Sequence, residues 1–187
     1  MENKAPKILL TGLPGCGKTT AIMQIVGSLH NKKLTGFYTQ EIRQNKRRTG
    51  FRWIRFDGSA GTLAHVDMKS PFKVGRYGVD IRGFDESVVP LLDVRRSNAK
   101  LFIIDEIGRI ECFSRQFVRA VQTLLASEKA VLATVAQKGH GLIAQVKTYP
   151  DIKILTLNRS NYDDTVTEIL RILAYLKEPS KDGRLTQ

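Results

Sequence analysis

Short apolar runs alternate with amphipathic segments along most of the chain. Four runs consist mainly of apolar residues, as in strands buried on both faces of a sheet: residues 7–11, 100–105, 130–135 and 152–157. Three longer segments repeat apolar residues at the spacing of one helix face: residues 18–29, 114–127 and 163–176. Strands that alternate with helices predict an α/β fold, with a mostly parallel sheet and helices on both faces.

The segment 34–83 interrupts this alternation. Residues 35–41 and 50–57 have the composition of strands, whereas residues 59–83 are rich in glycine and predict short strands and loops. Successive strands without a helix between them join most simply as antiparallel neighbours. We therefore expect this segment to add antiparallel strands at one edge of the sheet.

Two further helices are expected, over residues 84–97 and over residues 139–147. Pro90 lies within the first and is expected to kink or break it, because proline has no backbone N–H to donate. No linker divides the chain. We therefore expect residues 1–178 to form one domain and residues 179–187 a flexible tail.

The composition favours a folded protein with anionic partners. Hydrophobic residues make up 42% of the chain, and the net charge is +12. Such a charge attracts phosphates, nucleotides or nucleic acid. Six basic residues fall in the segment 43–55: Arg43, Lys46, Arg47, Arg48, Arg52 and Arg55. This segment is either a solvated hairpin tip or a clamp for phosphate or nucleic acid.

The sequence favours a cytoplasmic protein with no membrane partner. No apolar run approaches the roughly 20 residues that a membrane-spanning helix needs, and residues 1–7 lack the apolar core of a signal peptide. Cys16 and Cys112 match no metal-ligand spacing, and two free thiols fit a reducing compartment. The sequence does not indicate an oligomeric state.

The strongest chemical signal lies between the first predicted strand and the first helix. Residues 12–19 fit G-x-x-x-x-G-K-[ST], the pattern of a loop that binds triphosphates through inward-facing backbone N–H groups. Lys18 is expected to reach the β and γ phosphates, and Thr19 to place its hydroxyl on Mg²⁺. The expected contacts are Gly12, Leu13, Pro14, Gly15, Cys16, Gly17, Lys18 and Thr19.

A second signal is the run of four apolar residues that ends in Asp105 and Glu106. A buried strand would carry Asp105 to the carboxyl edge of the sheet, where α/β folds bind ligands. We expect Asp105 to hold Mg²⁺ through its water shell and Glu106 to polarise the attacking water as a general base. With the loop, this pair predicts Mg²⁺-dependent hydrolysis of nucleoside triphosphates.

Residues 105–108 also fit the D-x-x-G pattern of GTPases. Those proteins usually add N-K-x-D, and the closest match, residues 158–161, lacks the final Asp. A guanine-specific switch is therefore not favoured, and the acid directly after Asp105 favours an ATPase arrangement.

Four other residues have open interpretations. Thr134 either lies close to the γ phosphate or is an ordinary strand residue. Asn158 and Arg159 either contact the base or the phosphates or have no such role. Arg109 either supplies positive charge in the transition state or is a surface residue.

The sequence resembles the small thermophilic-type nucleoside-triphosphatases, known in animals as cancer-related nucleoside-triphosphatase. The resemblance is carried by residues 12–20, 36–41, 47–51, 74–80, 104–111 and 113–114. It implies a three-layer P-loop fold with a RecA-like sheet, and slow hydrolysis of ATP, GTP and other triphosphates with little base selectivity. It also implies nucleotide contacts at Thr20, Leu101, Phe102, Ile103, Ile104, Asp105, Glu106, Ile107 and Gly108.

The sequence departs from that family at three positions. Cys16 replaces an expected Val, which the loop should tolerate because its backbone makes the contacts. Gln40 replaces an expected Glu, and Arg109 an expected Lys. If either charge takes part in catalysis, the rate will differ.

Two other functions remain open from the residues alone. In a nucleoside, nucleotide or polynucleotide kinase, the basic segment 43–55 would act as a phosphate-clamping lid. In a nucleotide-regulated nucleic-acid-binding protein, Phe51, Trp53 and Phe56 would form a stacking surface. Alternation along a strand explains these aromatic residues equally well as core residues.

Overall fold

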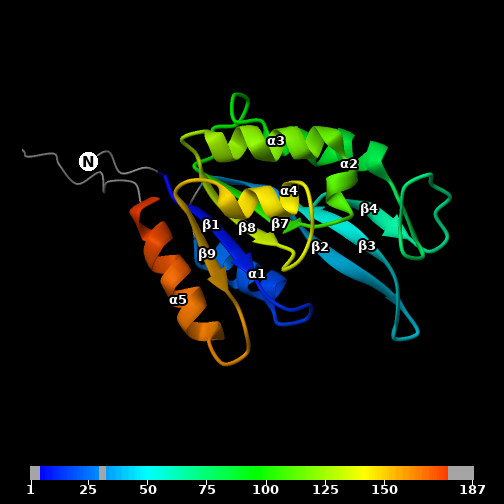
Figure 1. Cartoon of the computed structure of the whole chain (residues 1–187), viewed down its shortest axis with the longest axis horizontal. Coiled ribbons are helices and arrows are strands. Elements are labelled where there is room, and N and C mark those ends of the chain that lie inside the picture. The colour runs from blue at the N-terminus through cyan, green and yellow to red at the C-terminus, as the bar shows by residue number, and fades with distance from the viewer. Residues whose placement is uncertain (1–4, 30–32, 177–187) are drawn as a thin grey trace, which may run out of the picture.

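The computed structural model describes residues 5–29 and 33–176, which contain one sheet of nine strands and five α-helices (Figure 1). The strands are β1 (Lys7–Thr11), β2 (Leu34–Gln44), β3 (Arg47–Arg55), β4 (Ala60–His65), β5 (Lys73–Val74), β6 (Tyr77–Val79), β7 (Leu101–Ile107), β8 (Ala130–Val135) and β9 (Ile152–Thr156). The α-helices are α1 (Lys18–Ser28), α2 (Ile81–Ser87), α3 (Arg115–Ala126), α4 (Leu142–Gln145) and α5 (Tyr162–Leu173). Four short 3₁₀ helices span Val89–Leu92, Glu111–Phe113, Val146–Thr148 and Ala174–Leu176.

The sheet has a parallel half and an antiparallel half. Its strand order is β5-β6-β4-β3-β2-β7-β8-β1-β9. The strands β2, β7, β8, β1 and β9 pair in parallel, and β3, β4, β6 and β5 extend the sheet in antiparallel pairs. The prediction that segment 34–83 adds antiparallel strands at one edge is therefore confirmed.

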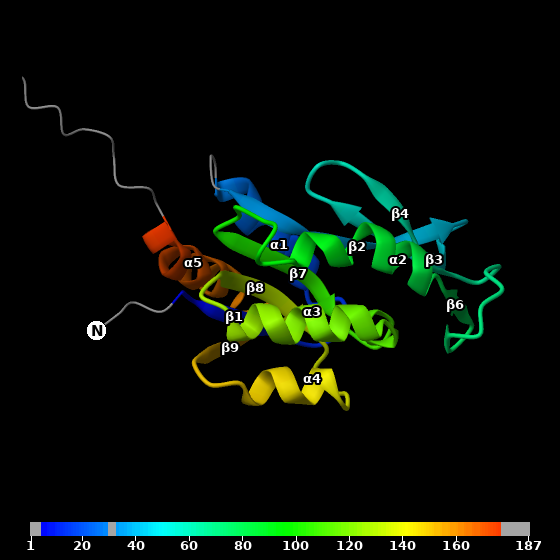
Figure 2. The ribbon, with the colours of Figure 1, turned by 90° about the horizontal axis from the view of Figure 1, so that it is seen from above.

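Side chains of the central strands alternate between two cores, one on each face of the sheet. Leu9 of β1 and Phe102 of β7 pack in the core that includes residues of α2, α3 and α4, the face seen in Figure 2. Ile8 and Leu101, their neighbours in sequence, pack with α1 and α5 on the opposite face. The period of two along each strand thus divides the apolar residues between the layers.

The helix expected over residues 84–97 is only partly correct. The structure begins α2 at Ile81, because the Asp80 carboxylate accepts a hydrogen bond from the Gly83 N–H at 2.9 Å and caps the first turn. The helix ends at Ser87, and Pro90 falls in the following 3₁₀ turn, where its missing N–H costs little. The expected helix over residues 139–147 begins only at Leu142 and ends with α4 at Gln145.

Two other expectations have different outcomes. Strand β7 continues beyond the expected end at residue 105 to Ile107, so both acids lie within the strand. The expected tail, residues 179–187, lies outside the described residues. Among the residues that the structure describes, no helix is long and apolar enough to cross a membrane.

The pairing of β2 with β7 requires a glycine at position 36. Gly36 has a φ of 129°, and a Cβ atom there would lie 1.9 Å from the carbonyl oxygen of Ile103. We expect Gly36→Ala to lower the free energy of unfolding by about 3 kcal/mol or more, measured by urea denaturation.

Gly27 provides the matched control. It lies in α1, and a Cβ atom there would meet nothing within 4 Å. Gly27→Ala should therefore leave the protein as stable or raise its stability by about 0.5–1 kcal/mol. Equal stabilities for the two variants would contradict the assigned contact between β2 and β7.

Candidate functional site

The loop between β1 and α1 forms the first part of the site. Gly12 has a φ of 155°, and a Cβ atom there would lie 2.4 Å from the carbonyl oxygen of Leu157. No side chain fits at this position, because the segment after β9 passes directly against the loop. Helix α1 begins at Lys18 without a side-chain cap and without an acid in its first turn. The first N–H groups of the helix therefore remain available to bind an anion.

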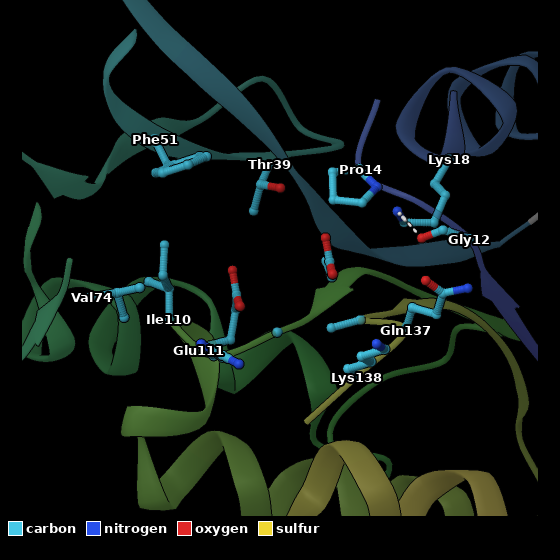
Figure 3. Close-up of a pocket in the computed structure, with 14 residues that line it drawn as sticks. Gly12, Pro14, Lys18, Thr39, Phe51, Val74, Ile110, Glu111, Gln137 and Lys138 are labelled. Atoms are coloured by element: carbon cyan, nitrogen blue, oxygen red, sulfur yellow. Dashed lines mark hydrogen bonds between the residues drawn. The ribbon is translucent and has the colours of Figure 1, made fainter. Parts of the chain in front are cut away.

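The ammonium group of Lys18 lies over this loop. Its Nζ donates hydrogen bonds to the carbonyl oxygens of Gly12 at 3.1 Å and Leu13 at 3.3 Å. Figure 3 shows the first of these contacts. Because both acceptors belong to the loop, the side chain folds back and holds its charge at the mouth of the anion site.

Asp105 is the buried acid of β7 and is only 1% exposed. The hydroxyl of Thr134, on the neighbouring strand β8, donates a hydrogen bond to Oδ1 of Asp105 at 2.5 Å. The other oxygen, Oδ2, is buried and accepts no hydrogen bond of normal length and angle from the described residues. Burial raises the pKa of this carboxyl, against the opposing effect of the Thr134 and Thr19 hydroxyls.

These oxygen atoms fit a magnesium ion. Magnesium prefers oxygen ligands and keeps several waters and phosphate oxygens, so it needs few ligands from the protein. The unpaired Oδ2 of Asp105 and the hydroxyl of Thr19, in the first turn of α1, provide such ligands. A bound cation would also offset the free-energy cost of the unpaired buried oxygen.

Glu106 lies between two neighbouring pockets. The first, of about 570 Å³, is lined by Gly15, Gly17, Thr19, Thr20, Arg43 and Arg48 among others, and we call it the loop pocket. The second, of about 450 Å³, is lined by Val74, Ile110, Glu111, Gln137 and Lys138 among others, and we call it the side chamber. Both share Pro14, Lys18, Thr39, Phe51 and Glu106.

The charge of Glu106 is controlled by its surroundings. Burial raises the pKa of its carboxyl, the positive charge of Lys18 lowers it and the negative charge of Asp105 raises it. A carboxylate with a raised pKa is a stronger base, and Glu106 borders the space in front of the loop where a nucleophile would enter.

The structure divides the basic segment 43–55. Arg43 and Arg48 line the loop pocket, and Glu41 accepts a hydrogen bond from each at 2.8 Å. Arg52 instead donates to Gln40 at 3.0 Å, and Arg55 pairs with Asp57 at 2.5 Å. Two arginines of the segment therefore lie at the loop, where a phosphate clamp would need them, and Arg52 and Arg55 are held by neighbouring side chains.

Phe51 and Trp53 of β3 and Phe56 just after it do not form one shared stacking surface for nucleic acid. Trp53 is only 7% exposed and belongs to a core. The Phe51 ring packs edge-on against Tyr77 at 5.4 Å between centroids, and Phe56 packs against Tyr38 at 5.8 Å. The interpretation of these residues as packed strand residues is correct.

Arg109 and the pair at 158–159 have different surroundings. Arg109 is exposed and lines the side chamber with Glu106. Asn158 and Arg159 are exposed and line neither pocket. The Asn158 side chain accepts hydrogen bonds from the backbone N–H groups of Ser160 and Asn161 at 2.9 and 3.0 Å, so it stabilises the turn before α5.

Several expected contact residues line neither pocket. Buried residues of β7 pack in the two cores and position the acids instead: Leu101, Phe102, Ile103, Ile104 and Ile107. Leu13 is 65% exposed, and Cys16 packs against the core below the loop. Thr134 is fully buried and holds Asp105, so it is a positioning residue.

The sequence did not indicate Thr39 or Glu111. Thr39 reaches the site because Tyr38 of β2 is the register partner of Asp105. Glu111 lies in the 3₁₀ helix after β7 and is only 5% exposed. Burial raises the pKa of the Glu111 carboxyl to about 8, helped by the negative charge of Glu106. Both residues fall in segments that carry the family resemblance, 36–41 and 104–111, but that resemblance assigned neither a role.

The chain is similar to known proteins over most of its length. The sequence model of the family described as NTPase matches residues 7–170. Nucleoside-triphosphatase THEP1 of Thermotoga maritima is 39% identical, over 90% of this chain and 96% of that protein. The cancer-related nucleoside-triphosphatase homolog of Mus musculus is 31% identical, over 89% and 95%. The crystal structure of THEP1 from the hyperthermophile Aquifex aeolicus has a TM-score of 0.80 at 32% identity, covering 92% of this chain and 99% of that chain.

The buried Glu111 predicts a pH-dependent stability. Its folded pKa of about 8 exceeds its unfolded value of 4.5, so its contribution is complete below pH 4.5 and is lost as the pH rises towards 8. Each unit of difference corresponds to about 1.4 kcal/mol. Glu111→Gln should therefore gain stability relative to wild type, by several kcal/mol, between pH 5 and pH 8 in urea denaturation.

The exposed Glu128 offers a control. Glu128→Gln should give a stability profile parallel to that of the wild type over the same pH range, because this side chain is solvated. If the profiles of Glu111→Gln and wild type also run parallel, the assigned ionisation of Glu111 is wrong.

Proposed function

The chain belongs to the NTPase family of nucleoside-triphosphatases, and we propose that it hydrolyses ATP, GTP and other triphosphates with Mg²⁺ and little base selectivity. The P-loop α/β fold and the resemblance seen in the sequence are confirmed. One arrangement carries the proposal. The Lys18 ammonium and the Glu106 carboxylate line the loop pocket. Asp105, next to Glu106 in β7, is buried behind them with Oδ2 unpaired, close enough to Thr19 and Lys18 for both to lower its pKa.

The loop would bind the triphosphate through its backbone N–H groups and the uncapped start of α1. Lys18 would exchange its carbonyl contacts for the β and γ phosphate oxygens. Arg43 and Arg48 line the same pocket and would add positive charge beside the phosphates.

Thr19 and Asp105 would hold the metal, the first with its hydroxyl and the second with Oδ2. When bound, Mg²⁺ neutralises charge on the β and γ phosphates. Thr134 keeps the Asp105 carboxylate in one orientation through its hydrogen bond to Oδ1. The proposed metal site thus consists of two ligands, Thr19 and Asp105, and one residue that orients a ligand, Thr134.

Glu106 would act on the attacking water. As the water oxygen bonds to the γ phosphorus, the bond from phosphorus to the β–γ bridging oxygen breaks and the diphosphate leaves. The proton released by the water passes to Glu106, whose pKa is raised by burial. Arg109 lines the chamber on the side of the attacking water and would stabilise charge on the γ-phosphoryl group.

The surroundings of Asn158 and Arg159 support the proposed low base selectivity. These two residues, the sequence-based candidates for base contacts, are exposed and line neither pocket. Most of the binding free energy would then come from the phosphates, which all nucleoside triphosphates share.

A cytoplasmic location forms part of the proposal and is supported by the free thiols of Cys16 and Cys112.

Removing the base should stop hydrolysis but not binding. We expect Glu106→Gln to lower the rate of phosphate release by about 100-fold or more, while a fluorescent triphosphate analogue still binds. Lys18→Ala should weaken both triphosphate binding and phosphate release, because it removes the ammonium group that would contact the phosphates. Glu168→Gln, whose side chain pairs with Lys153 outside both pockets, is the matched control and should release phosphate at the wild-type rate. Equal rates in all four proteins would contradict the assignment.

The metal should be required for phosphate release. EDTA should abolish it, and added Mg²⁺ should restore it. Asp105→Asn should raise the Mg²⁺ concentration needed for half-maximal release at least about tenfold, because one ligand loses its charge. Asp164→Asn, an exposed acid of α5, should leave the titration unchanged. Full activity in EDTA would rule out a metal-dependent reaction.

A further inference from the structure

The side chamber is larger than hydrolysis requires. One water takes up about 30 Å³ of liquid volume, whereas the chamber measures about 450 Å³. Small-molecule sites are typically about 300–1,000 Å³. The terminal phosphate would occupy the part next to Gly12 and Lys18. The attacking water would fill only a small fraction of the part beyond Glu106.

The chamber lies on the side from which a nucleophile must approach. In phosphoryl transfer the attacking and leaving oxygen atoms are roughly in line across the phosphorus. Glu106, the proposed base, lines both pockets, but Thr19 and Thr20 of α1 and the arginines that would hold the phosphates line only the loop pocket. A group in the chamber would therefore attack from the side opposite the departing diphosphate. A molecule in the chamber is therefore placed as an acceptor and not as the leaving nucleotide.

The wall of the chamber far from the loop combines apolar and polar groups. Figure 3 shows Phe51, Val74 and Ile110 on the side opposite Gly12 and Lys18. The Phe51 ring is held by its edge contact with Tyr77 and by the Arg48 guanidinium, 5.0 Å from the ring centroid, and it provides apolar contact area in the chamber. The carboxyl of Glu111, on the same side in Figure 3, can exchange hydrogen bonds with polar edges, and so can the amide of Gln137, which lies across the chamber near Gly12.

The charges around the chamber disfavour a second phosphate beside the proposed base. Glu106 borders the position where the acceptor would react and would repel a phosphate there. Glu111 is mostly protonated at pH 7, because its pKa is raised to about 8, and can donate a hydrogen bond, whereas Arg109 and Lys138 are exposed at the rim. A flat ring system with polar edges, a hydroxyl group and no charge describes a nucleoside.

We propose that the side chamber binds a nucleoside whose hydroxyl group replaces water as the acceptor of the γ-phosphoryl group. This inference rests on the proposed binding and activation of the triphosphate at the loop. The hydroxyl oxygen bonds to the γ phosphorus, and the bond between that phosphorus and the bridging oxygen breaks. The electron pair leaves with the nucleoside diphosphate, and the hydroxyl proton passes to Glu106. The products are a nucleoside monophosphate and a nucleoside diphosphate.

The test measures where the labelled phosphate goes. The full chain is incubated with Mg²⁺, [γ-³²P]ATP and one of adenosine, guanosine, cytidine, uridine or thymidine at millimolar concentration. Thin-layer chromatography separates labelled monophosphate from inorganic phosphate. The ratio of these products is the readout, because it does not depend on total turnover. We expect labelled monophosphate with at least one nucleoside, rising to saturation with its concentration.

Variants then locate the acceptor site. Val74→Trp, which would fill the far part of the chamber, should lower the product ratio about tenfold or more. Lys73→Trp, at the exposed neighbouring position that lines neither pocket, should keep the ratio. Ile110→Ala removes apolar contact without adding bulk and should also lower the ratio, so the test stands if Val74→Trp does not fold.

Each other outcome overturns part of the proposal. Release of inorganic phosphate alone, with every nucleoside, would show that the chamber does not hold this acceptor. Labelled monophosphate in unchanged ratio in both chamber variants would place the acceptor elsewhere. Absence of both products in the wild type would contradict the proposed hydrolysis itself, and with it this inference.

Discussion

One buried carboxylate determines how this site is arranged. Asp105 is almost completely removed from solvent, and Thr134 satisfies only one of its oxygen atoms. An unpaired buried oxygen costs free energy until a cation binds it. Because β8 lies between β7 and β1, the residue that orients Asp105 comes from a strand inserted between the acid and the phosphate loop. The loop and the acid are therefore positioned by the order of three parallel strands.

The two pockets that meet at Glu106 differ in the kind of molecule that they suit. The loop pocket carries Arg43 and Arg48, both held by Glu41, and suits the phosphates. The side chamber has an apolar wall and a buried acid, and suits a neutral molecule. Water and a hydroxyl compound would both meet the γ phosphate beside Glu106. The outcome of the reaction is then decided by what occupies the chamber, because the phosphate and the base are the same in either case.

Part of this arrangement was predictable because its signals are local. The run before Asp105, the glycines of the loop and the alternation of apolar residues each act within a few positions, and the parallel sheet with its antiparallel edge was confirmed. The sequence-based prediction began α2 three residues too late. Its signal was local too, because the Asp80 side chain caps the helix by accepting a hydrogen bond from the Gly83 N–H. Thr39 was missed because its position depends on the pairing of β2 with β7, which are more than fifty residues apart in the chain.

The sequence alone determined the phosphate loop, the acidic strand and the alternating elements that bring both to one edge of the sheet, because periodicity and backbone freedom are properties of neighbouring residues. The tertiary structure decided the rest. Which threonine orients Asp105, which arginines of the basic segment lie at the loop and which side chains enclose the chamber all depend on strand order. Strand order brings together residues that are distant in the chain, and packing of the whole sheet selects it.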